Sequence, residues 1–132
     1  GDKCLVRMAQ ALANTLGSRA GLVARLGGEE FAVVLRHCTP ASARALAEAM
    51  REAVHDITVP NGHVTVRLSC SIGVAVGEVG DEESWRRLLA RSDAAMYRAK
   101  TNGRNRVMLD ETNNLDYAFD FDAPMSSSPH LG

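Results

Sequence analysis

Apolar residues recur along the chain with two different spacings, and each spacing predicts a type of element. Between residues 3 and 16 they fall three or four positions apart, which predicts an amphipathic helix. The same spacing follows Thr39 and the proline after it, a pair typical of a helix N-cap and a first helical position. It returns after Asp81 and stops at Asn102-Gly103. The pattern therefore predicts three helices.

Short apolar runs between these helices predict strands. Runs near 22–26 and 30–36 enclose a glycine-rich turn, which predicts a β-hairpin. Alternating valines in 64–68 predict a half-exposed strand, whereas the small and apolar stretch 70–76 predicts a buried one. A last short strand is expected at 106–109. The order of helices and strands predicts an α+β fold in which helices pack on the faces of a sheet.

Length and charge exclude several classes of protein. The chain has 132 residues, of which 45% are hydrophobic, so we expect one domain with a real core. With 15 basic and 16 acidic residues, it has no overall positive field for nucleic acid. Its three widely spaced cysteines match neither a disulfide framework nor a zinc site and favour a reduced, cytoplasmic setting. No apolar run approaches membrane-spanning length. A longer parent protein with a membrane anchor elsewhere in its sequence is compatible with this observation.

Residues 110–132 differ in composition from the rest. They contain five acidic residues and neither lysine nor arginine, and they end in a serine-rich stretch typical of a disordered or linker segment. Tyr117, Phe119 and Phe121 nevertheless alternate with smaller or polar residues, at strand spacing. We therefore expect an acidic, partly aromatic tail whose segment 116–122 packs against the domain, with an edge strand as one arrangement.

The candidate chemistry lies at the tip of the predicted hairpin, in Gly27-Gly28-Glu29-Glu30. Glycine adopts backbone conformations that are closed to other residues, and it lets a ligand approach the main chain. Carboxylates bind hard divalent cations through oxygen. The four residues therefore indicate either a turn that binds a nucleotide phosphate with Mg²⁺ or an ordinary hairpin with a solvated acidic turn.

The heptapeptide from Arg25 to Phe31, which contains this turn, resembles the signature of the GGDEF family, the diguanylate cyclases, in its GGEEF form. Other segments that resemble the family follow its order, at Gly1-Asp2, Ser69–Ala75, Asp93–Lys100 and Gly103–Val107. The resemblance covers residues 1–109 and implies a nucleotidyl-cyclase-like fold, with a ferredoxin-like core, a mixed sheet and flanking helices. It also implies a partial GGDEF catalytic domain that lacks the family's first central strand.

The resemblance also implies a function. The family joins two GTP molecules into cyclic di-GMP and releases two pyrophosphates, and each 3′-hydroxyl attacks the α-phosphate of the other nucleotide. This implies a signalling nucleotidyltransferase that uses Mg²⁺ (or Mn²⁺), works as a homodimer and follows an upstream sensory or receiver domain. The implied catalytic and metal-binding residues are Glu29 and Glu30. The implied nucleotide-binding residues are Gly27 and Gly28 in the hairpin, Lys100 and Arg104 at the terminal phosphates, and Asp2 at guanine.

Two departures from the family pattern limit what the chain is expected to do. The missing strand would carry a metal-binding aspartate, and the helix after it a guanine-binding asparagine, so we expect the isolated chain to be inactive. The family's product-inhibition site is Arg-x-x-Asp, but Leu22 stands three residues after Arg19, so no inhibitory site is expected. Arg98 and Arg106 match no family position and are expected to be solvated. The alternative function is a degenerate GGDEF domain that senses GTP or recruits a protein partner.

Overall fold

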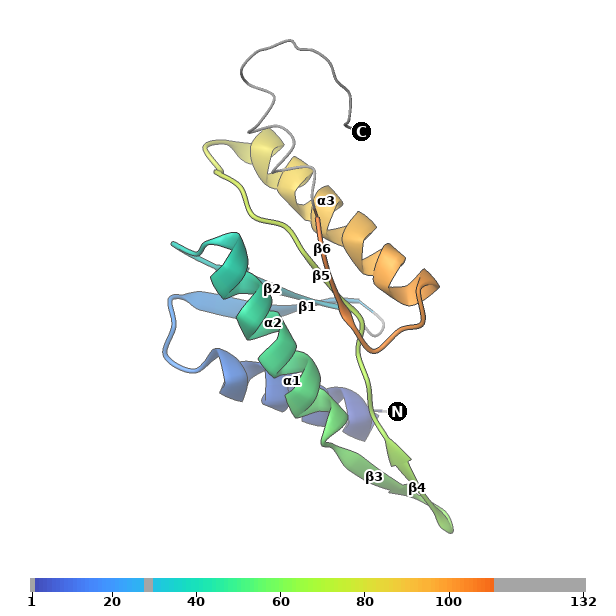
Figure 1. The fold of residues 1–132 in the computed structure, drawn as a ribbon. Coiled ribbons are helices and arrows are strands. Elements are labelled where there is room, and N and C mark those ends of the chain that lie inside the picture. Colours follow the sequence, from blue (N-terminus) through green and yellow to red (C-terminus); the bar gives the residue numbers. More distant parts are fainter. Residues whose placement is uncertain (1, 28–29, 111–132) are drawn as a thin grey trace.

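The computed structural model describes residues 2–27 and 30–110, and it describes the backbone but not the side chain of Asp2. These residues form three helices and six strands (Figure 1). In chain order they are α1 (Asp2–Leu16), β1 (Gly21–Gly27), β2 (Glu30–Leu35), α2 (Pro40–His55), β3 (Thr58–Asn61), β4 (Val64–Arg67), β5 (Ile72–Val74), α3 (Glu82–Thr101) and β6 (Val107–Leu109). Within these residues, no helix has the length and apolar character needed to span a bilayer. The aromatic segment 116–122 lies outside the described residues.

Two helices begin where the sequence predicts, because each has a complete capping box. The Thr39 hydroxyl accepts a hydrogen bond from the Ser42 backbone N–H over 3.1 Å, and the Ser42 hydroxyl oxygen accepts one from the Thr39 N–H. The same exchange joins Asp81 and Ser84 at the start of α3. Backbone N–H groups that would otherwise lack partners in the first turn are thereby satisfied.

The strands form three separate two-stranded sheets. β1 and β2 are antiparallel, β3 and β4 are antiparallel, and β5 and β6 are parallel neighbours joined through α3. Among the described residues, no strand pairs with the second edge of β2 or of β5. A strand between those two edges would unite β1–β2 with β5–β6 into one mixed sheet. The separation of the two pairs is what the expected absence of the family's first central strand predicts.

The core has two parts, one on each side of α2. The first fills the space between α1 and α2 and is covered by one face of β2; its buried members are Leu12, Leu16, Leu46, Met50 and Val54. The second joins α2 to the β5–β6 pair through Ala43, Ala47, Val74 and Val107. Helix α2 therefore lies against both halves of the molecule (Figure 1).

The hairpin of β3 and β4 differs from its prediction. Val64 and Val66 were expected on the buried face of a half-exposed strand, but Val64 is 64% exposed and all four residues of β4 are exposed. The hairpin extends beyond the end of α2, away from both parts of the core (Figure 1). The alternation of apolar and polar residues thus predicted the strand but not its burial. Burial depends on which elements pack against the strand.

Candidate functional site

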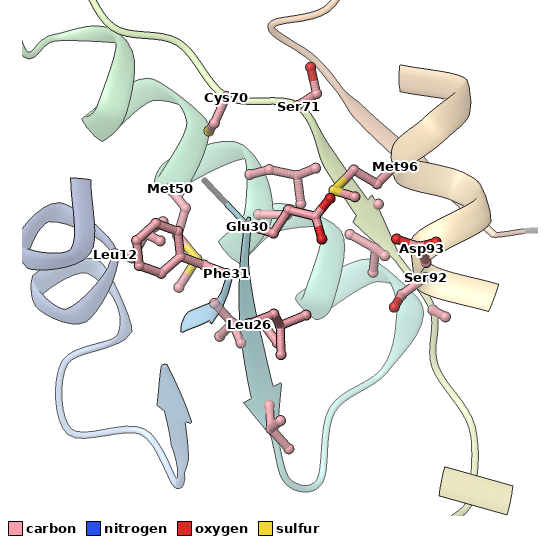
Figure 2. Close-up of a pocket in the computed structure, with 18 of the residues that line it drawn as sticks. Leu12, Leu26, Glu30, Phe31, Met50, Cys70, Ser71, Ser92, Asp93 and Met96 are labelled. Atoms are coloured by element: carbon pink, nitrogen blue, oxygen red, sulfur yellow. The ribbon is translucent and has the colours of Figure 1, made fainter. Parts of the chain in front are cut away.

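A cavity of about 970 Å³ lies between the hairpin, the three helices and the segment that forms β5. Its lining includes most of β2, the stretch 68–75, and residues from α1, α2 and α3. Figure 2 shows Glu30 pointing from the start of β2 towards Met96 on α3, whereas the ring of Phe31 lies on the other side of the strand, beside Leu12 and Met50. The cavity thus lies beside the two strand edges that have no described partner.

The hairpin places the carboxylate of Glu30 at this cavity. Gly27 pairs with Glu30 at the end of the antiparallel ladder, after an irregularity between Arg25 and Gly27. Gly27 has φ +147°, a conformation that L side chains rarely adopt, so this position requires glycine. Gly28 and Glu29 follow it and lie outside the described residues. The predicted hairpin is confirmed, and the roles of Gly28 and Glu29 stay predictions.

The end of α3 brings two cations to the same cavity. Lys100 lies in the last turn of the helix and Arg104 in the loop after it, and both line the cavity together with Glu30. The helix ends in a Schellman-type turn, since the Arg104 N–H donates to the Ala99 carbonyl over 2.9 Å and Gly103 has φ +120°. Three of the residues selected from the sequence therefore line the same large cavity.

Two further residues selected from the sequence lie at the two ends of helix α1. Asp2 is the first residue of α1, and because its side chain is not described, its contact with guanine stays a prediction. Arg19, in the position of the family's inhibitory arginine, donates from Nη1 to the carbonyls of Thr15 and Leu16, each over 3.1 Å. Its guanidinium therefore caps the C-terminus of α1.

The described residues do not by themselves make a metal site. Within 2–27 and 30–110, no group of three or more His, Cys, Asp or Glu side chains is placed to hold a metal ion. Glu30 and Asp93 are the carboxylates in the cavity lining. Cys70 also lines it, but burial raises the pKa of its thiol to about 11, against a smaller opposing effect of Arg51. The thiol therefore stays protonated at neutral pH and offers no thiolate ligand.

Three residues near the site were misjudged or missed in the sequence. Arg98 is half-buried and donates from Nη2 to the Leu109 carbonyl over 3.0 Å, so the prediction that it is solvated was wrong. Its long side chain reaches from α3 to β6 because the two elements pack together. Asp93 was quoted within a family segment but was given no role, although it lines the cavity. Arg51 carried no signal, because its partner Asn105 is 54 residues away.

Comparison with known proteins identifies the family of this chain. The family described as diguanylate cyclase, GGDEF domain, matches residues 1–106. The chain belongs to the GGDEF family. Diguanylate cyclase A of Treponema denticola is 35% identical over 113 residues, which are 86% of this chain and 30% of that protein. The GGDEF chain thus spans about a third of this curated relative.

Solved GGDEF structures share the fold. The active GGEEF domain of a diguanylate cyclase from Vibrio cholerae is 32% identical with a TM-score of 0.70, over 83% of this chain and 67% of that one. Diguanylate cyclase SiaD from Pseudomonas aeruginosa, solved in complex with its activator SiaC, is 30% identical with a TM-score of 0.72. That match covers 82% of this chain and 40% of the SiaD chain. The predicted α+β, nucleotidyl-cyclase-like fold is confirmed.

Proposed function

We propose that this chain is part of a diguanylate cyclase domain, which condenses two GTP molecules into cyclic di-GMP and two pyrophosphates. The observation that carries the proposal is the cavity whose lining includes both Glu30 from the GGEEF hairpin and Lys100 and Arg104 from the end of α3. Phosphoryl transfer depends on positioning and on neutralising phosphate charge, and this set of charges suits both tasks.

Each residue of the site has a distinct task in this proposal. Lys100 and Arg104 bind the terminal phosphates, where the guanidinium of Arg104 offers two parallel donors and the Lys100 ammonium a compact charge. Gly27 and Gly28 let the hairpin backbone approach the nucleotide. Asp2 accepts hydrogen bonds from the adjacent N1–H and N2–H₂ groups of guanine, a two-point contact that selects this base.

A divalent cation belongs to the proposed site. Nucleotidyl transfer generally uses such ions, and Glu29 and Glu30 would hold Mg²⁺ or Mn²⁺ with carboxylate oxygens. A further carboxylate is expected from the family's first central strand, upstream of residue 1. When bound, the ion would neutralise phosphate charge and ease deprotonation of the 3′-hydroxyl. The chain's own residues bind and orient the triphosphate.

The reaction itself suggests how the parent protein is organised. Because each GTP attacks the other, two copies of the domain must face each other, so we propose a homodimer. An upstream sensory or receiver domain would control that pairing, and the solved complex of SiaD with its activator supports control by a partner. GTP and its product lie in the cytoplasm, where this domain would work whether or not its parent is anchored in a membrane.

The test is synthesis of cyclic di-GMP by the full-length parent protein. We expect the wild type to produce it from GTP, Glu29→Ala to lose the activity, and Arg104→Ala to raise the KM for GTP. Arg87→Ala, on α3 but outside the cavity lining and 61% exposed, is the matched control and should retain activity. Equal activity of the wild type and Glu29→Ala would refute the metal-ligand assignment. An inactive parent that still binds GTP would favour the sensing module instead.

A further inference from the structure

We propose that Arg51, on helix α2, is a positioning residue that fixes the loop of Arg104 through a hydrogen bond to Asn105. Nη1 of Arg51 donates to Oδ1 of Asn105 over 3.1 Å. The inference deepens the proposed function, because it rests on Arg104 binding a terminal phosphate. It assigns a role in that site to a residue that does not line the cavity.

The loop needs such support because its backbone conformation is unusual. Gly103, Arg104 and Asn105 have φ values of +120°, +63° and +49° in succession. The left-handed region is open to glycine and tolerated by asparagine, but it is unfavourable for arginine. A run of positive φ angles persists only where surrounding contacts hold it. The position of the Arg104 side chain therefore depends on contacts outside the loop.

Contacts to both sides of the loop hold Asn105 in place. Its backbone N–H donates to the Ser71 hydroxyl oxygen over 3.2 Å, from the segment that leads into β5. Its side-chain oxygen accepts from Arg51 on α2. Asn105 is thus attached to two different elements, and Arg104 lies between this attachment and the end of α3. A change at either attachment would alter where the Arg104 guanidinium meets a phosphate.

Arg51 is itself held in the orientation that this contact requires. Its Nε donates to Oε1 of Glu48 over 2.9 Å, and its Nη2 lies 3.9 Å from Oε2 of Glu52. The Arg51 side chain is 20% exposed, whereas the side chains of Glu48 and Glu52 are 41% and 70% exposed. Two carboxylates on α2 therefore orient one edge of the guanidinium, and the remaining Nη1 reaches Asn105.

The experiment compares GTP and GMP binding by the full-length parent protein. The 3′-deoxy forms of both nucleotides are used, because without the attacking hydroxyl no turnover occurs. We expect Arg51→Ala to weaken 3′-deoxy-GTP about tenfold, the effect of losing a charged hydrogen bond, while 3′-deoxy-GMP binding is unchanged. Arg51→Lys should restore part of the GTP affinity, and Arg44→Ala, at an exposed position of α2, should match the wild type.

A double-mutant cycle tests whether the effect passes through Asn105. Asn105→Gly keeps the left-handed conformation accessible but removes the acceptor, so Arg51→Ala should have no further effect on GTP affinity in that background. In the 132-residue chain, Arg51→Ala should speed amide exchange at Asn105, whereas Arg44→Ala should leave it unchanged. This second readout needs no nucleotide.

The outcomes distinguish a failure of the positioning role of Arg51 from a failure of the proposed function. If Arg104→Ala weakens GTP binding but Arg51→Ala does not, the positioning role is wrong and the phosphate clamp stands. If Arg104→Ala leaves GTP affinity unchanged, the phosphate clamp itself fails, whatever Asn105 exchange shows. Equal losses of GTP and GMP affinity in Arg51→Ala would mean a general structural defect and would also overturn the inference.

Discussion

Nε of Arg91 on helix α3 lies 2.8 Å from Oδ2 of Asp110, the residue that follows strand β6. The Asp110 side chain is only 5% exposed, and its backbone N–H donates to the Val74 carbonyl at the end of β5. Arg91 also donates from Nη2 to the Val76 carbonyl over 3.0 Å. The pair therefore ties α3 to the ends of both strands that it covers.

Removing Arg91 should lower the free energy of unfolding far more than removing an exposed arginine that lies at the same distance from its partner. Arg91→Ala deprives a buried carboxylate of its guanidinium, and we expect a loss of about 2–3 kcal/mol, since Arg91 itself is 25% exposed. Arg86 lies 2.8 Å from Glu82 on the same helix, but these side chains are 74% and 76% exposed. Arg86→Ala should cost about 0.5 kcal/mol or less. Urea unfolding measures both, and equal losses would contradict the assignment.

Gly73 should tolerate no side chain, because β5 runs directly against the backbone of α3. A Cβ at this position would overlap the Ser92 carbonyl and the Met96 amide. Gly73→Ala must push helix and strand apart, and we expect a loss of about 3 kcal/mol or more in free energy of unfolding. Gly80→Ala is the control, because a Cβ there meets nothing within 4 Å. Chemical denaturation of the two variants decides the point, and a Gly73→Ala protein as stable as Gly80→Ala would contradict it.

The start of α3 should make stability depend on acid pH. The hydrogen bond from the Ser84 backbone N–H holds the pKa of Asp81 below its ordinary value of 3.8. A carboxylate with a lowered pKa in the folded state stabilises it fully above the ordinary value and loses this effect as the pH falls through the folded-state pKa. Melting temperatures of wild type and Asp81→Asn should therefore agree better at pH 2 than at pH 6. A constant difference would exclude this contribution.

Cys70 should react slowly with alkylating reagents in the folded protein. Burial raises the pKa of its thiol to about 11, so little thiolate is present at pH 8. We expect the alkylation rate to rise steadily towards pH 11, and to be much faster at pH 8 in denaturant. Because Arg51 lowers this pKa, Arg51→Ala should slow the reaction further. Rapid alkylation of folded Cys70 at pH 8, located by mass spectrometry, would contradict the burial argument.

The 132-residue chain alone should not turn over GTP, whereas its parent should. In the proposed site, the aspartate and asparagine expected upstream of residue 1 would complete the metal and guanine contacts. A version extended upstream to include an apolar strand should also bind less of a hydrophobic dye, because that strand would pair with the edges of β2 and β5 that have no described partner and cover apolar residues that line the cavity. Steady production of cyclic di-GMP by the 132-residue chain would overturn this expectation.

Local sequence predicted elements and their ends well, because helix caps and turns depend on neighbouring residues. Thr39 and Asp81 begin helices as expected, and Gly103 ends one. Contacts between distant elements were not predictable from spacing. Arg98 was assigned to solvent and Arg51 received no role, because their partners come from elements brought near only by folding. The candidate site residues were selected through the family resemblance, because spacing alone left the role of the hairpin ambiguous.

The loop of Arg104 depends on a contact between parts of the chain that are distant in sequence. Strands β5 and β6 pair Ile72 with Val107 across α3, and the bond between Arg51 and Asn105 joins residues 54 positions apart. Each doubling of the length of a closed loop costs only about 0.6 kcal/mol more, so the two separations differ little in entropy. Because the bond to Arg51 forms only when α2 packs against β5 and β6, the Arg104 loop should reach its final conformation last, when α2 docks.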